Sequence, residues 1–311
     1  MTVALVSHRA CLAHDTGPGH PERRERLAAV LDALGESAFP MLDRHDAPLA
    51  PEDAIVAVHD AAHVASILSL DLAAGQLGAL DADTFVSAGS CEAALRAAGG
   101  AMRGVDLVIG GVADAAFVAV RPPGHHATPD RAMGFCLFNN VAIAAHHARR
   151  AHGLERVAVV DFDVHHGNGT QDMFWADPGM LFLSSHQFPC YPGTGDRHER
   201  GQHSNIVNAP LPPGSGSDAF HRAWRDVLLP ALDQFAPQIL IISAGFDAHR
   251  ADPLAQLSLD EEDFAWITRE LMATMARHAP GRIVSLLEGG YDLAALAASA
   301  AAHVRALAGG T

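Results

Sequence analysis

The stretch from Val157 to Thr170, VAVVDFDVHHGNGT, constrains the fold of this chain more than any other. It opens with the apolar run VAVV, which is typical of a strand buried on both faces of a parallel sheet. Because side chains alternate along a strand, we expect Asp161, Asp163 and His165 to point to one side. Buried polar groups of this kind need partners, so we predict a functional site at the end of this strand.

The composition suits a globular enzyme. The chain has 311 residues, which is enough for one large α/β domain or two small ones. Neither a linker nor a repeat divides it, so we expect a single catalytic domain over residues 1–311. The net charge of −15 argues against binding to nucleic acid and would suit a cationic ligand, although solubility is the commoner reason for such a charge.

The sequence shows no sign of export or of a membrane span. No apolar run is long enough to cross a bilayer, and the N-terminus lacks the pattern of a signal peptide. We therefore expect a cytoplasmic protein without a membrane partner, and the sequence leaves a homo-oligomer open. The cysteines, at positions 11, 91, 136 and 190, are widely scattered, so free thiols are expected.

Strand and helix patterns alternate along the chain. The expected strands cover residues 3–6, 55–58, 116–120, 157–160, 181–186, 239–243 and 283–287. The expected helices cover residues 61–72, 87–103, 139–151, 220–235, 260–275 and 294–307, and one more lies around residues 27–34. Ser258 or Asp260 is the expected cap of the helix near residue 260. The Gly- and Pro-rich segment 187–216 is expected to be loop. This alternation predicts an α/β fold with a mainly parallel sheet.

Polar motifs follow five of the expected strands. They are PPGHH, DFDVHH, SSH, GFD and GGY. In parallel α/β sheets, ligands bind beyond the carboxyl ends of the strands. Because all five motifs fall at such ends, we expect them to form one site.

Asp163, His165 and Asp247 would supply two carboxylates and one imidazole to that site. Three protein ligands with an open position are the pattern of a catalytic metal centre. A purely structural explanation is open for each residue alone: the two aspartates could cap helices, and His165 could bind a backbone carbonyl. It explains the occurrence of all three together poorly. Since the ligand set is rich in oxygen, it would accept Fe²⁺ or Co²⁺ as well as Zn²⁺.

His125 and His126 follow Pro-Pro-Gly, so both can face the site from an irregular loop. Asp161 and Asn168 are candidate acceptors for their second ring nitrogens. An aspartate favours the imidazolium more than an asparagine does, so the two histidines could differ in pKa and in role. The hydroxyl of Tyr291 could donate to a developing oxyanion, although Gly-Gly-Tyr alone is more often a turn.

Taken together, the motifs resemble those of the zinc-dependent histone deacetylase family. The likeness is closest to class II-like bacterial members and to the related acetylpolyamine amidohydrolases. The matching motifs are HPERRERL (20–27), RPPGHHA (121–127), GFCLFNN (134–140), DFDVHHGNGTQ (161–171), YPGTG (191–195), SAGFDAH (243–249) and LEGGYD (287–292). The resemblance implies one arginase-like α/β domain, with a central eight-stranded, mainly parallel sheet flanked by helices.

The resemblance also implies roles for single residues. The implied zinc ligands are Asp163, His165 and Asp247. The implied catalytic groups are the tandem histidines His125 and His126, their partners Asp161 and Asn168, and the oxyanion-binding Tyr291. The implied substrate-binding residues are Gly134, Phe135, Tyr191, Leu254 and Gly289, with Arg26 beside an acetate-release channel. A structural potassium ion is implied at Asp161, Asp163, His165, Ser184 and Ser185.

The implied reaction is removal of acetyl or other acyl groups from N-acetyl-lysine or related acetylated amines by zinc-activated water. The expected partners are an acetylated lysine peptide or protein, or an acetylated small amine. An acetylpolyamine deacetylase is the first alternative, but Leu254 occupies the position where an acidic residue would favour polyamines. An arginase-like dinuclear manganese enzyme would need a carboxylate where the chain has Gly245. A catalytically silent acyl-lysine binding module would be expected to lack Tyr291 or a tandem histidine, and both are present.

Overall fold

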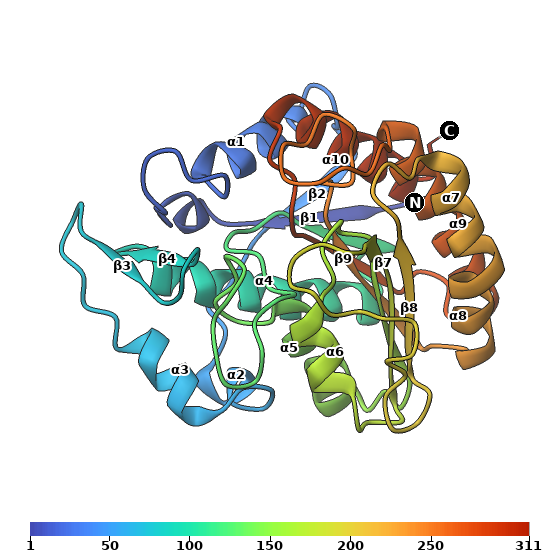
Figure 1. Cartoon of the computed structure of the whole chain (residues 1–311), viewed down its shortest axis with the longest axis horizontal. Coiled ribbons are helices and arrows are strands. Elements are labelled where there is room, and N and C mark those ends of the chain that lie inside the picture. Colours follow the sequence, from blue (N-terminus) through green and yellow to red (C-terminus); the bar gives the residue numbers. More distant parts are fainter. Residues whose placement is uncertain (311) are drawn as a thin grey trace.

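A large parallel sheet runs through the centre of the computed structural model, which describes residues 1–310 (Figure 1). Its strands are β1 Val3–Ser7, β2 Leu42–Asp46, β5 Ala115–Val118, β6 Val157–Asp161, β7 Met180–Gln187, β8 Ile206–Leu211, β9 Ile239–Ala244 and β10 Ile283–Leu287. Their order is β2-β1-β5-β10-β9-β6-β7-β8, and each neighbouring pair is parallel. The carboxyl ends of the strands therefore share one edge of the sheet.

Helices cover both faces of the sheet, as parallel crossovers require. They are α1 Arg24–Ala33, α2 Glu52–Ile55, α3 Ala61–Leu68, α4 Ser90–Ile109, α5 Asn140–His152, α6 Asn168–Phe174, α7 Ser217–Ala223, α8 Leu229–Phe235, α9 Glu261–His278 and α10 Leu293–Leu307. One layer holds α1, α7, α8, α9 and α10, and the other holds α4, α5 and α6 (Figure 1). A hairpin of β3 Leu77–Ala79 and β4 Phe85–Ser87 projects at the left of Figure 1.

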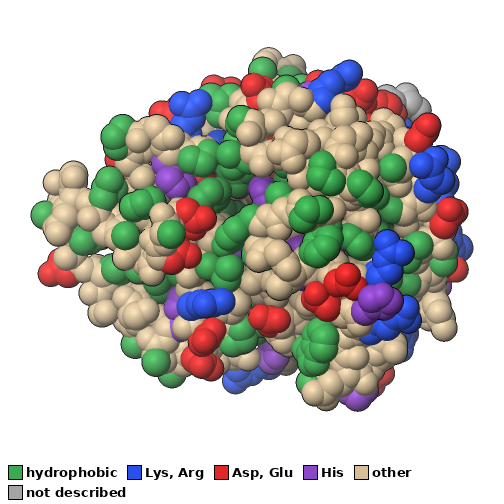
Figure 2. All heavy atoms as spheres, viewed as in Figure 1, with side chains coloured by type: hydrophobic (Ala, Val, Ile, Leu, Met, Phe, Trp, Pro, Cys, Tyr) green, Lys and Arg blue, Asp and Glu red, His purple; other side chains and the backbone are tan. Residues whose placement is uncertain are grey.

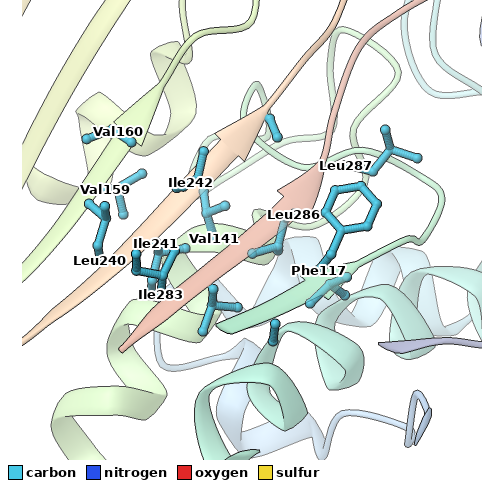
Figure 3. Close-up of a cluster of buried hydrophobic side chains, with 14 of the residues drawn as sticks. Phe117, Val141, Val159, Val160, Leu240, Ile241, Ile242, Ile283, Leu286 and Leu287 are labelled. Carbon is cyan, nitrogen blue, oxygen red and sulfur yellow. The ribbon is translucent and has the colours of Figure 1, made fainter. Parts of the chain in front are cut away.

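The core lies between these layers and holds the central strands rigidly. Figure 3 shows aliphatic side chains of β6, β9 and β10 packed together, among them Val159, Ile241 and Ile283. All three are buried, and each such side chain contributes about 1.5–3 kcal/mol by leaving water. Helix α4 comes close to the sheet at Gly104, where a Cβ atom would lie 2.8 Å from Val284 Cγ1. Close packing of these strands therefore fixes the positions of the residues that directly follow their carboxyl ends.

The predicted α/β fold with a parallel sheet is confirmed, but two predictions about single segments were wrong. Residues 55–58 are not a strand, because helix α2 ends at Ile55 and turns follow. Glu52 and Asp53 in its first turn favour a helix start, and the apolar run was too short to decide between the two. Segment 187–216 is not all loop, because it contains β8. As an edge strand, β8 tolerates Pro210.

Other differences concern the bounds of elements. Strand β2 was not predicted, since its sequence LDRHD is mostly polar. Helix α4 begins at Ser90 and continues to Ile109, α3 ends at Leu68, and a π-helical turn separates α7 from α8. Asp260 caps α9 as predicted, with a capping box closed by Asp263.

The four cysteines are free thiols, as expected. Among residues 1–310, no helix has both the length and the apolar character that crossing a membrane demands.

Candidate active site

Asp163, His165 and Asp247 meet beyond the ends of β6 and β9. His165 Nδ1 lies 3.2 Å from Asp163 Oδ1 and 3.1 Å from Asp247 Oδ2, and all three residues are buried. Strand alternation does not place them as expected, because β6 ends at Asp161. Successive hydrogen bonds do so instead: Asp161 Oδ1 accepts from Asp163 N, and Asp163 Oδ1 accepts from His165 N.

The backbone holds the outer oxygens of both carboxylates. Gly289 N donates to Asp163 Oδ2 at 2.8 Å, and Val164 N donates to Asp247 Oδ1 at 2.9 Å. These bonds turn Asp163 Oδ1 and Asp247 Oδ2 toward His165. Burial alone would lower the pKa of His165, but the hydrogen bonds that its ring donates to Asp163 and Asp247 raise it well above the usual value. The cluster therefore favours a positive charge, and its donor set fits a divalent metal ion.

Two glycines leave the cluster no room for a further side chain. A Cβ atom at Gly245 would overlap Asp163 Oδ2, and one at Gly289 would overlap Asp247 Oδ2. A dinuclear site of the arginase type needs a carboxylate at residue 245, and the packing excludes it. Gly289, expected among the substrate-binding residues, packs against Asp247 and Asp163 of this cluster.

The tandem histidines lie on the loop after β5, with ring centroids 4.0 Å apart. His125 Nδ1 is 2.9 Å from Asp161 Oδ2, and His126 Nδ1 is 2.8 Å from Asn168 Oδ1. The structure thus brings together both pairs named from the sequence. Glu288 Oε2 accepts from the backbone N–H of His125 at 3.2 Å and so fixes the loop.

The two partners give the rings opposite properties. Burial alone would favour a neutral His125, but the carboxylates of Asp163 and Asp161 raise its pKa to about 10. Burial and the neighbouring charge on His125 lower the pKa of His126 well below its usual value. Because Asn168 Oδ1 accepts from the Nδ1–H of a neutral His126, the Nε2 lone pair is free to accept a proton. These shifts favour the charged form of His125 and the neutral form of His126.

A pocket of about 210 Å³ leads from the surface to these groups. It is lined by Asp83, His126, Gly134, Phe135, His165, Tyr191, Leu254 and Tyr291. Aromatic rings form its walls: the centroids of Phe135 and Tyr291 lie 5.9 Å apart, and Tyr191 stands 5.1 Å from His126. Figure 2 shows a recess with histidine atoms inside and hydrophobic and acidic side chains around it. Such a channel suits an apolar stem with a polar group at its inner end.

The wall that carries Phe135 has an unusual backbone. Gly134 and Phe135 both have positive φ angles, of 56° and 69°. Gly134 also packs so closely that a Cβ atom there would lie 2.5 Å from His126 Cδ2. A phenylalanine in the left-handed region is strained, and such strain is common at binding sites. The hydroxyl of Thr84 accepts from Phe135 N at 3.1 Å and helps to hold this turn.

Tyr291 is held from behind by residues that do not line the pocket. Its backbone N–H donates to Asp252 Oδ2 at 2.7 Å. Arg26 is fully buried, its guanidinium carbon lies 4.8 Å from the Tyr291 ring centroid, and it donates to the carbonyls of Glu288 and Gly290. Burial raises the pKa of Tyr291 well above its usual value, so its hydroxyl stays a proton donor. Arg26 was expected beside a release channel; the structure places it behind this turn.

Of the residues named for potassium, Asp161 ends β6, Ser184 and Ser185 lie in the adjacent β7, and Asp163 and His165 follow the end of β6. Asp161 pairs in register with Ser184, whose hydroxyl lies 2.9 Å from His186 Nδ1. The Ser185 hydroxyl accepts from Trp224 Nε1 at 3.0 Å. Potassium binding there stays a prediction.

Two residues of the site were missed by the sequence reasoning. Asp83 lines the pocket from the segment before β4, and Asp252 binds the backbone of Tyr291. Neither follows a strand end directly, so the pattern that found the other residues carried no signal for them.

Comparison with known proteins gives matches over nearly the full length. The family described as "Histone deacetylase domain" matches residues 20–307. A "Probable deacetylase" of Archaeoglobus fulgidus is 39% identical over 302 residues, which cover 94% of this chain and 82% of that protein. A "Histone deacetylase-like amidohydrolase" of Pseudomonas aeruginosa is 40% identical over 314 residues, 93% of this chain and 81% of the relative. A crystal structure of the HDA15 HD domain superposes with a TM-score of 0.93 at 34% identity, covering 100% of this chain and 89% of that one.

Proposed function

The chain belongs to the histone deacetylase family, and we propose that it is a zinc-dependent amidohydrolase that removes acetyl groups from N-acetyl-lysine side chains or related acetylated amines. Family membership supports deacetylase chemistry in general. One observation carries the finer proposal: the cluster of Asp163, His165 and Asp247 adjoins His126 and Tyr291 at one aromatic-walled pocket.

Asp163, His165 and Asp247 would hold the metal, with Fe²⁺ or Co²⁺ as alternatives to Zn²⁺. Bound there, the ion would supply Lewis-acid polarisation of the acetyl carbonyl and of a water molecule. We also propose a structural K⁺ ion at Asp161 and Ser184, with the main-chain carbonyls of Asp163, His165 and Ser185.

His126 acts as the general base and acid. Its Nε2 accepts the proton of the attacking water and later donates it to the leaving amine. Asn168 keeps the ring in the required tautomer through the Nδ1 contact of 2.8 Å. The carboxylates of Asp163 and Asp161 favour the protonated form of His125, which therefore stabilises negative charge in the site instead of accepting that proton.

Tyr291 donates its hydroxyl proton in a hydrogen bond to the acetyl oxygen as that oxygen gains negative charge. Asp252 and Arg26 hold the turn in place for this contact. Phe135 and Tyr191 enclose the methylene stem of the substrate, and the carbonyl of Gly134 accepts from its amide N–H.

The substrate in this proposal is acetyl-lysine in a peptide or protein, because the uncharged Leu254 stands at the pocket. One observation favours an acetylpolyamine as the second candidate. Asp83 also lines the pocket, and a carboxylate there would attract a distal ammonium group.

Acetate release distinguishes these candidates. Metal-loaded protein is given an acetyl-lysine peptide or N-acetylputrescine, and the Tyr291→Phe variant serves as the blank. We expect a higher kcat/KM for the peptide, and a loss of at least about a hundredfold in kcat for Tyr291→Phe, the scale of one lost oxyanion donor. Higher kcat/KM for N-acetylputrescine would favour the second candidate. Peptide binding without acetate release would point to a silent binding module.

A further inference from the structure

A second cluster of metal-binding side chains lies between α4 and α5. Asp106 of α4 accepts at Oδ1 from Nε2 of His147 and from Nε2 of His152, both on α5 and both at 2.7 Å. The two rings stand at 90° with centroids 5.4 Å apart, and one donor atom from each residue lies within 4.8 Å of the others. From this convergence we propose that Asp106, His147 and His152 form a second divalent transition-metal site, with Zn²⁺ as its ion.

The spacing of the donor atoms is close to what zinc requires. Ligands about 2.0–2.1 Å from a tetrahedral zinc lie about 3.3–3.4 Å from one another. The Nε2–Oδ1 distances of 2.7 Å mean that each ring would need to withdraw by only about 0.6 Å, within the reach of a small side-chain rotation. Two imidazoles and one carboxylate are also a donor set found in zinc sites that keep an open position.

The surroundings allow a cation to enter. The side chains of His147, His152 and Asp106 are 17%, 24% and 40% exposed, so packing orients them while water can complete the ligand sphere. Burial would raise the pKa of Asp106, but the hydrogen bonds from the two histidines lower it overall, so the carboxylate is ionised. His147 and Met102 also line a cavity of about 350 Å³ beside α2. This cavity gives a metal ion a second route to the cluster.

The place of the cluster in the fold indicates its effect. Asp106 is in the last turn of α4, His152 is the last residue of α5, and the two helices pack together. These helix ends lead into β5 and β6, so the cluster lies at the amino edge of the sheet, away from the active site. An ion bound there would link the ends of two helices and stabilise the fold without touching the substrate.

Zinc content per chain tests this proposal. The protein is equilibrated with Zn²⁺, freed of unbound metal and analysed by mass spectrometry of the metal. The test variant is His152→Gln, and the control is His146→Gln, which removes a neighbouring histidine of α5 that is not in the cluster. We expect about two zinc ions in the wild type and in the control, and about one in His152→Gln, with unchanged acetate release in all three.

Asp247→Ala separates this site from the active site. It should retain about one zinc, and Zn²⁺ should raise its Tm, whereas the double variant Asp247→Ala/His152→Gln should show neither effect. Equal zinc content in the wild type and in His152→Gln, or no zinc in folded Asp247→Ala, would overturn the proposal. A dinuclear active site would behave in the opposite way, losing both ions in Asp247→Ala and keeping both in His152→Gln. If the zinc contents are as expected but the wild-type protein releases no acetate, the proposed function is wrong and the second metal site stands.

Discussion

Replacing Asn168 by Asp tests the difference between the two histidines. Asn168 Oδ1 lies 2.8 Å from His126 Nδ1, and Asp161 Oδ2 lies 2.9 Å from His125 Nδ1, so the variant gives His126 the kind of partner that His125 already has. A carboxylate stabilises the imidazolium, and we therefore expect the pKa of His126 to rise.

The size of the rise follows from the short contact. Two unit charges about 4 Å apart attract by about 4 kcal/mol at an effective dielectric constant of about 20. That energy equals about three pKa units, and the cost of burying the new carboxylate leaves an expected rise of about one to three units. A base works only when it is neutral, so the acid limb of the kcat/KM profile moves to higher pH. On that limb activity falls, and it returns as the pH is raised.

The assay measures acetate release from an acetyl-lysine peptide between about pH 5 and pH 9. Asn168→Ser is the matched control, because it keeps a neutral acceptor, and its acid limb should move far less than that of Asn168→Asp. If the limb of Asn168→Asp stays in place or moves to lower pH, His126 is not the group that must lose its proton.

Two further substitutions address the metal and the substrate. Gly289→Ala would place a Cβ atom against Asp247 Oδ2 and Asp163 Oδ2, so we expect zinc affinity to fall by about 10- to 100-fold in a competition titration with a chelator. Unchanged zinc affinity would show that the backbone at residue 289 shifts to accommodate the methyl group without moving Asp163 or Asp247. Asp83→Asn removes the pocket's carboxylate, so KM for N-acetylputrescine should rise more than KM for the peptide. An equal change for both substrates would refute a role in attracting the ammonium group.

The fold could be predicted from the sequence where strands are buried on both faces. Strands β6 and β9 lie in the middle of the sheet and contain continuous apolar runs over residues 157–160 and 239–242, and this local pattern is enough to identify them. Leu42–Asp46 and Ile206–Leu211 lie at the two edges. Edge strands face solvent on one side, so their mixed polar sequences look like loop, and only pairing with a neighbour defines them.

The site could be predicted where its residues directly follow strand ends. Asp83 reaches the pocket through the packing of a hairpin, and Asp252 reaches Tyr291 through a turn. Asp106 meets His147 across 41 positions of the sequence, with no motif to link them among 20 histidines. The cytoplasmic location and the oligomeric state stay predictions, because no single residue contact bears on them.

The metal dependence of acetate release tests the central claim most directly. Protein stripped by a chelator is given an acetyl-lysine peptide while Zn²⁺ is added back in steps. The structure predicts that stripping abolishes acetate release, that Zn²⁺ restores it, and that Asp247→Ala stays inactive at every zinc concentration, because Asp247 is part of the metal cluster. Undiminished acetate release from the stripped protein, or a wild-type rate from Asp247→Ala, would contradict it.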